Sequence, residues 1–160
     1  MYPIFNNITF NGYIKNGTTY PEWFGAKGDG AKGCYSFIQN TIDSMSGGYL
    51  ELQIGTYLVS STIELKRGII IKGKGNDDTK KKGTIIKLAD KANCSMLKLA
   101  IDAENYNGIE NFTFDGNASN QSQPAIGVKI HGFITSYIEN VMMKGMNMPL
   151  LYRLKIHQEQ

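Results

Sequence analysis

The sequence predicts an all-β protein, a short right-handed parallel β-helix of about three coils with an N-terminal β-hairpin and one capping α-helix. Three observations favour this fold. Only one stretch of the 160-residue chain has a helical period, strand-like runs follow it, and one of these runs recurs. An all-β unit that recurs after roughly twenty to thirty residues is typical of a solenoid.

Length and composition fit one domain with a core of its own. The formal net charge of +3 is too small to indicate a nucleic-acid partner. No apolar run approaches the ~18 residues of a membrane span, and the N-terminus lacks the layout of a signal peptide. Cys34 and Cys94 lack zinc-ligand spacing, so we expect no metal and no cofactor. Buried free thiols are favoured, and a disulfide between these cysteines stays open.

Three segments are expected along the chain. Residues 1–22 form a lead-in arm with a hairpin around Asn11-Gly12, a strong hairpin signal between alternating residues. Residues 23–48 form a glycine turn and the capping helix. Residues 49–160 form the coils of the β-helix, within the same single domain.

The capping helix is predicted over Tyr35–Met45. One helical stripe is formed by the apolar and small residues Phe37, Ile38, Thr41, Ile42 and Met45. Gly47 and Gly48 then end the helix, because glycine readily takes the left-handed conformation that closes helices. Such a helix is suited to cover the open N-terminal end of a solenoid.

The glycine turn before this helix, with Gly25, Gly28 and Gly30, resembles a phosphate-binding loop. A dinucleotide fingerprint, however, needs a preceding parallel strand and a following βαβ unit, and the chain beyond the helix is β only. We therefore interpret Gly28, Asp29 and Gly30 as a structural turn in which Asp29 caps nearby amides. Phosphate binding is the less favoured alternative.

The rest of the chain consists of short strands. Leu50, Leu52 and Ile54 are expected on one face, as are Tyr57 and Val59. Further strand-like runs cover 84–88, 96–99, 109–114, 127–130 and 137–143. We expect coils at Thr56–Gly75, Met96–Asn117 and Gly127–Met146, with Thr84–Leu88 as an extra strand between the first two.

The repeat carries the solenoid prediction. The run IENFTFDG at Ile109–Gly116 matches IENVMMKG at Ile138–Gly145, 29 residues later. Gly68, which opens GIIIKG, is placed in the same register as Asn111 and Asn140. Glycine and asparagine visit the left-handed region most cheaply, so these positions predict a recurring tight bend. Stacked asparagine side chains can then bond along the axis of the solenoid.

Several motifs in this order resemble one known family. The runs FGAKGDG, FIQNTID, GGYLELQIGTYLVSSTIELKRGIIIKGKG and TIIKL resemble the N-terminal part of the pectate-lyase-like β-helix superfamily, over Tyr20–Gly145. Its members are polysaccharide lyases, galacturonan and rhamnogalacturonan hydrolases, and trimeric phage tailspike or appendage proteins. The lead-in YPEWFGAKGDG is particularly similar to the phage versions.

The chain departs from the family pattern in two places. Family members usually have an Asp-Asp-Thr cluster before the helix, where this chain has Gly33, Cys34 and Tyr35. Ser36 is expected to take over the N-cap role. Family enzymes carry their catalytic carboxylates several coils further on than this sequence extends, so we assign no catalytic residue.

Three acidic residues are candidate ligand-binding positions. Glu110 and Glu139 occupy equivalent places in the repeat, and stacked carboxylates about 5–5.5 Å apart would suit a retaining glycosidase. The alternative is a pair of solvent-facing like charges beside the bend. Asp115 directly follows a strand, where it either contacts a sugar hydroxyl or forms a turn.

The expected function is that of a phage virion protein, structural or receptor-binding, of tailspike or appendage type. We expect a homotrimer in the virion, with other virion proteins and bacterial surface polysaccharide as partners, and no membrane insertion. The alternative is a polysaccharide lyase or glycoside hydrolase. A third alternative is a structural subunit with no ligand.

Overall fold

The computed structural model describes residues 12–15, 17–76, 82–99, 106–131 and 136–153. Its elements in chain order are β1 (Gly17–Thr19), η1 (Pro21–Phe24), β2 (Asp29–Gly33), α1 (Tyr35–Asp43), β3 (Gly48–Glu51), β4 (Gly55–Val59), β5 (Ile63–Leu65), β6 (Ile69–Lys72), β7 (Thr84–Leu88), β8 (Ser95–Leu99), β9 (Gly108–Asp115), η2 (Ala118–Asn120), β10 (Ile126–His131), β11 (Tyr137–Lys144) and β12 (Met148–Arg153). The described chain is therefore mostly β with one α-helix, as predicted.

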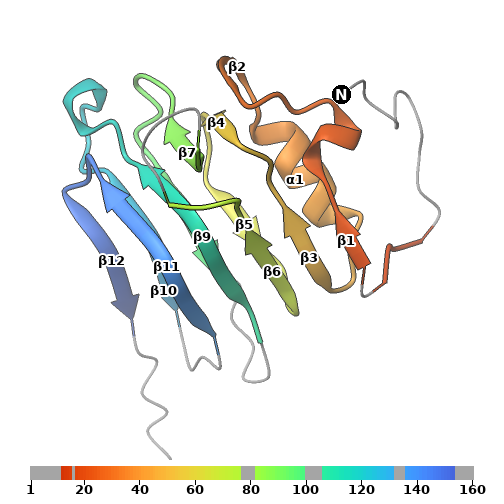
Figure 1. Cartoon of the computed structure of the whole chain (residues 1–160). Helices are drawn as coiled ribbons and strands as arrows, with labels where there is room; N and C mark the ends of the chain where they lie inside the picture. The colour runs from red at the N-terminus through yellow and green to blue at the C-terminus, as the bar shows by residue number, and fades with distance from the viewer. Residues whose placement is uncertain (1–11, 16, 77–81, 100–105, 132–135, 154–160) are drawn as a thin grey trace, which may run out of the picture.

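The strands wind into a short right-handed parallel β-helix, and every strand pair is parallel. One sheet has the order β1-β3-β6-β9-β7-β4-β2 with β11 on β9, and the other has β12-β10-β8-β5. Successive coils begin at β5, β8 and β10, and β12 follows the last of them. Figure 1 shows this progression from α1 at one end of the stack to β11 and β12 at the other.

The strand Thr84–Leu88 is not an extra strand between two coils. It is β7, which pairs with β4 on one side and with the C-terminal half of β9 on the other. It is therefore the regular third strand of the coil that begins at β5. In the next coil the single strand β9 covers both positions, so the insertion between β6 and β7 hid this equivalence in the sequence.

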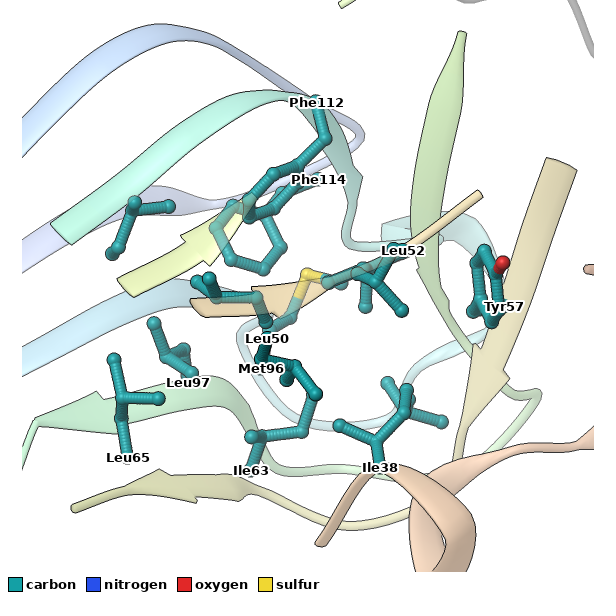
Figure 2. Close-up of a cluster of buried hydrophobic side chains, with 14 of the residues drawn as sticks. Ile38, Leu50, Leu52, Tyr57, Ile63, Leu65, Met96, Leu97, Phe112 and Phe114 are labelled. Carbon is teal, nitrogen blue, oxygen red and sulfur yellow. The ribbon is translucent and has the colours of Figure 1, made fainter. Parts of the chain in front are cut away.

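Apolar ladders fill the interior of the coils. Leu50, Ile71 and Ile109 lie in register on β3, β6 and β9, and all three are fully buried. The rings of Phe112 and Phe114 contact edge to face, with centroids 4.8 Å apart. Figure 2 shows these rings and Ile38 of α1 entering one cluster around Leu50, Leu52, Ile63 and Met96.

The prediction that Ile54 shares a face with Leu50 and Leu52 is wrong, since 51% of Ile54 is exposed and the two leucines are fully buried. Strand β3 ends at Glu51 and β4 begins at Gly55, so Ile54 lies in the turn between them. Alternation of side chains between the two faces does not continue through a turn. Tyr57 and Val59 on β4 are buried, as predicted.

Helix α1 covers the end of the stack beside β5, as predicted. Ile38 and Ile42 are fully buried against the first coil. The side-chain amide of Gln39 accepts a hydrogen bond from the Glu64 N–H (3.0 Å) and donates one to the Glu64 carbonyl (3.2 Å). Gln39 thus serves both backbone groups of a β5 residue at the sheet edge, as a neighbouring strand would.

Ser36 does not cap this helix. The N-cap residue is Cys34, and its side chain makes no capping hydrogen bond. The Cys34 N–H instead donates to the Leu58 carbonyl of β4 (2.6 Å), which ties the start of the helix to the sheet. Tertiary attachment replaces the local cap that the sequence pattern lacks.

The first strand of the hairpin predicted around Asn11-Gly12 lies outside the described residues, as does Asn11 itself. Beyond it, Ile14 forms a parallel bridge with Met45, and β1 pairs in parallel with β3. The described part of the arm therefore extends the larger sheet.

The bend at the asparagines is confirmed. Asn111 and Asn140 have φ values of 58° and 51°, in the left-handed region. The Asn140 side chain donates to Asn111 Oδ1 (2.8 Å), and the Asn76 side chain donates to Asn140 Oδ1 (2.8 Å). These bonds form the expected asparagine ladder along the axis.

The register assigned to Gly68 is wrong. Strand pairing places Ile71 opposite Ile109 and Lys72 opposite Glu110, so Gly73 is the residue level with Asn111. A Cβ at Gly73 would lie 2.4 Å from the Asn111 carbonyl oxygen, and only glycine permits this approach. Gly68 has a left-handed φ of 72°, but it marks a separate bend before β6.

Both cysteines are free thiols, Cys34 buried and Cys94 half-buried, and burial raises the pKa of each. Within the described residues, no helix is long and apolar enough to cross a membrane.

Candidate functional site

One outward face of the larger sheet collects charged side chains from four neighbouring strands. Strand pairing aligns Glu51 with Lys72, Lys72 with Glu110, and Glu110 with Glu139. These positions alternate with the buried ladder that contains Ile71 and Ile109, so their side chains point away from the core. The row runs along the axis of the solenoid.

A second row, which contains two tyrosines, lies two positions earlier on the same face. Tyr49, Ile70, Gly108 and Tyr137 are aligned across β3, β6, β9 and β11. The Tyr137 ring lies over Gly108, where a Cβ would come within 2.6 Å of its Cζ atom. Its centroid is 5.9 Å from that of Tyr106, which is 57% exposed. We call Tyr49, Lys72, Tyr106, Glu110 and Tyr137 the tyrosine–glutamate face.

Glu110 lies at the centre of this face and is held on both sides. Its Oε1 accepts a hydrogen bond from the Tyr137 hydroxyl, and its Oε2 lies 3.5 Å from Lys72 Nζ. Burial and the neighbouring Glu110 carboxylate raise the pKa of Tyr137. Tyr137 therefore keeps its proton at neutral pH and remains a donor to Glu110.

Glu139 lies in register with Glu110, as the repeat predicted, but its side chain is exposed. Glu110 is half-buried, and both of its oxygens already have partners. A retaining glycosidase needs one carboxylate free to attack and one free to transfer a proton. The partnered oxygens of Glu110 differ from the free carboxylates that this chemistry uses.

Asp115 lies away from the tyrosine–glutamate face. Its Oδ1 accepts the Asn117 N–H (3.0 Å), and its Oδ2 is 4.0 Å from Lys144 Nζ. These contacts fit the turn-forming alternative, since an aspartate that bonds its own chain two residues on forms an Asx turn.

The glycine turn holds the chain close to β4. Asp29 Oδ1 accepts the N–H groups of Ala31 (2.9 Å) and Lys32 (3.1 Å), and these bonds lower the pKa of Asp29. A Cβ at Gly28 would lie 3.2 Å from the Gly55 Cα, and Gly30 has a φ of 70°. The capping of local amides by Asp29 is thus present.

Sequence reasoning missed the aromatic half of the face. Tyr49, Tyr106 and Tyr137 come from three separate runs. Strand register places Tyr49 and Tyr137 in one row, and a ring contact with Tyr137 adds Tyr106. A signal was available at one position: Tyr137 and Gly108 each directly precede a copy of the repeat, so a large and a small residue alternate there.

No family model matches the sequence, and no curated protein matches it significantly. Solved structures do match. The A-module of the mannuronan C-5 epimerase AlgE4 from Azotobacter vinelandii matches with a TM-score of 0.70 and 26% identity. The match covers 85% of this chain and 41% of the epimerase module. ORF18 of Geobacillus virus E2 matches with a TM-score of 0.61 and 24% identity, over 78% of this chain and 25% of the viral protein. PfbA, a surface adhesin of Streptococcus pneumoniae, matches with a TM-score of 0.61 and 18% identity, over 89% of this chain and 40% of the adhesin.

These neighbours confirm the fold that the motifs predicted. The chain has a pectate-lyase-like parallel β-helix fold, and a phage protein is among the structures that share it. The chain spans less than half the length of each of these structures.

Proposed function

We propose that this β-helix belongs to a phage virion protein of tailspike or appendage type, and that its tyrosine–glutamate face binds bacterial surface glycan. The observation that carries the proposal is the combination on one exposed face of three tyrosines with Glu110, which is held in place by Tyr137 and Lys72. Aromatic rings pack against the C–H faces of sugars, and fixed polar groups select their hydroxyls.

The fold neighbours support this proposal from two directions. A Geobacillus virus protein shares the fold, which supports a virion role. An epimerase of mannuronan and a surface adhesin share it as well, which supports contact with polysaccharides or cell surfaces. We also propose that the protein is a homotrimer that acts outside the cell, together with other virion proteins.

The test is binding to intact bacteria and to their purified surface polysaccharides. Tyr106→Ala removes an exposed ring that contacts Tyr137, and should weaken glycan binding about tenfold while leaving the fold intact. Tyr13→Ala is the matched control, because Tyr13 is 64% exposed and lies in a different pocket, beside Met45 and Arg67. Equal binding by both variants would contradict the proposal.

An enzyme is the second candidate, because the structural neighbour with 26% identity is named as an epimerase that acts on a polysaccharide. A polysaccharide lyase or glycoside hydrolase would release unsaturated products or reducing ends. We expect neither from this chain. Product release that is lost in Glu110→Gln and kept in Glu64→Gln would replace binding by catalysis as the function of this face.

A further inference from the structure

A second polar site lies at the capped end of the molecule, in a cavity of about 450 Å³ beside β4. None of the residues around it belongs to the tyrosine–glutamate face. Its lining includes Glu22, Lys27, Gly28, Asp29, Ile54 and Tyr57. A cavity of this volume is in the range of small-molecule sites, which run from about 300 to 1,000 Å³.

Glu22 is a buried carboxylate in the wall of this cavity, with only 7% of the residue exposed. Its Oε1 accepts hydrogen bonds from the Tyr57 hydroxyl and from the Gln53 N–H (3.3 Å). Its Oε2 is buried, and no hydrogen-bond donor in the described part of the chain reaches it. An unsatisfied buried acceptor destabilises a protein by about 1–3 kcal/mol, and by more if it is charged.

Within the described residues, the charge of Glu22 also lacks a counterion. Among the described residues, no ammonium or guanidinium group lies within 4.0 Å of the Glu22 carboxylate. Lys27 lies at the same cavity, but its charge acts on Asp29 and lowers the pKa of that carboxyl, after two backbone hydrogen bonds that do the same. The buried carboxylate of Glu22 is therefore the group left to be neutralised.

We propose that this cavity binds a sugar-sized ligand through a primary ammonium group, which donates a hydrogen bond to Glu22 Oε2 and neutralises its charge. Lys27 and Asp29 then contact the hydroxyl or carbonyl groups of the same ligand at the mouth of the cavity. The ammonium group belongs to an amino sugar, which also supplies hydroxyl groups for Lys27 and Asp29.

The oxygen atoms that line the cavity favour an ammonium group over a metal ion. The described residues contain no group of three or more histidine, cysteine or acidic side chains that could hold a metal. A hard cation such as Ca²⁺ takes about six to eight oxygen ligands, and only two carboxylates line this cavity. One ammonium group needs only a few acceptors and fits the single unsatisfied oxygen.

Two of the residues that line the cavity together with Glu22 have exposed side chains. Lys27 is exposed, and 51% of Ile54 is exposed, so both change rotamer within picoseconds to nanoseconds. Gly28 packs closely against the other lining residues, because a Cβ there would lie 3.3 Å from both the Ile54 carbonyl oxygen and Tyr57 Cζ. Because Oε2 of Glu22 is buried, a ligand reaches it only after side chains of the cavity wall move.

The experiment is a titration of the ¹⁵N-labelled protein, followed by NMR at constant ionic strength. The Gln53 amide reports directly on the site, since it donates to Glu22. The ligands are glucosamine and Nα-acetyl-lysinamide, with glucose, tetramethylammonium chloride and CaCl₂ as comparisons. We expect saturable millimolar binding of the two primary amines and at least tenfold weaker binding of the other three. Tighter binding of glucosamine than of the lysine derivative supports an amino sugar, and the reverse order would overturn that assignment.

The variant Glu22→Gln keeps the shape of the side chain and removes its charge, so amine affinity should fall at least tenfold. Glu64→Gln is the control, because Glu64 pairs with Lys98 on the other sheet and should leave amine binding unchanged. Unchanged affinity in Glu22→Gln would overturn the proposal. So would equal binding of glucose, equal binding of tetramethylammonium, or tighter binding of Ca²⁺.

The ligand series is measured on the parent protein, so it decides the matter even if Glu22→Gln does not fold. Failure of this proposal leaves the proposed function untouched, because Tyr106→Ala tests a different face.

Discussion

The two ends of the solenoid differ in how their last coil is covered. At the α1 end, Ile38 and Ile42 are fully buried, and Gln39 bonds the backbone of β5. At the β11 end, Ile138 is 39% exposed although it continues the buried ladder of Ile71 and Ile109. The same inward position is thus core in one coil and surface in the next. Stability in a stacked fold depends on the neighbouring coil as much as on the residue.

The largest expected effect comes from one pair of substitutions in that ladder. Ile109→Ala should lower the free energy of unfolding by about 2–5 kcal/mol, because it leaves a cavity between two coils. Ile138→Ala removes the same atoms from a partly exposed position and should cost less than half as much. Urea denaturation of both variants measures the difference. Equal losses would mean that the β11 end is covered in solution.

The substitution Gln39→Ala should uncover the edge of β5. It removes two hydrogen bonds to Glu64, so we expect a loss of about 1–2 kcal/mol. The freed edge can also pair with another chain, so oligomers should increase with concentration. Denaturation and size-exclusion chromatography with light scattering test both effects. If neither changes, α1 covers the end through its apolar face alone.

The asparagine ladder offers a comparison within the repeat. Asn111→Ala places alanine at a φ of 58° and breaks the bond from Asn140, so the expected cost is about 1–2 kcal/mol. Asn111→Gly relieves the backbone strain and loses only the ladder bond, so it should cost less. Thermal unfolding of the two variants separates the cost of backbone strain from that of the lost hydrogen bond. A larger loss for Asn111→Gly than for Asn111→Ala would contradict a left-handed bend at this position.

The smallest effect is expected on the surface of the capped end. Lys66 and Asp43 form an ion pair of 2.8 Å, but both side chains are about half exposed, at 46% and 49%. Asp43→Asn should therefore cost no more than about 0.5 kcal/mol, and salt should reduce that difference further. Denaturation at low and high ionic strength measures it. A loss as large as that of Gln39→Ala would show that the ion pair contributes as much as the Gln39 amide to the attachment of α1.

The fold was largely readable because its signals are local. The helical stripe around Ile38 and Ile42, the turn residues and the repeated IEN run each depend on residues a few positions apart. The assignment of Gly68 failed because a leading glycine was matched instead of the strand register. The assignment of Ile54 to the face of Leu50 and Leu52 failed because alternation was extended into a turn.

The candidate site was readable only in part. Equivalent places in the repeat predicted that Glu110 and Glu139 would align, and they do. Sequence distance gives no such link between Tyr49, Tyr106 and Tyr137, which come together only when coils of unequal length are stacked. The burial of Glu22 was likewise hidden, because its partners Gln53 and Tyr57 lie more than thirty residues further on.

The sequence by itself determined the kind of coil this chain forms, since alternation, turn residues and the 29-residue repeat act over short distances. The tertiary structure decided which residues meet across coils, because loop lengths between strands set the register of one coil on the next. The partners of Glu110, the unsatisfied oxygen of Glu22 and the exposure of Ile138 all follow from that register. Each arises from contacts between coils, which a pattern along the chain does not encode.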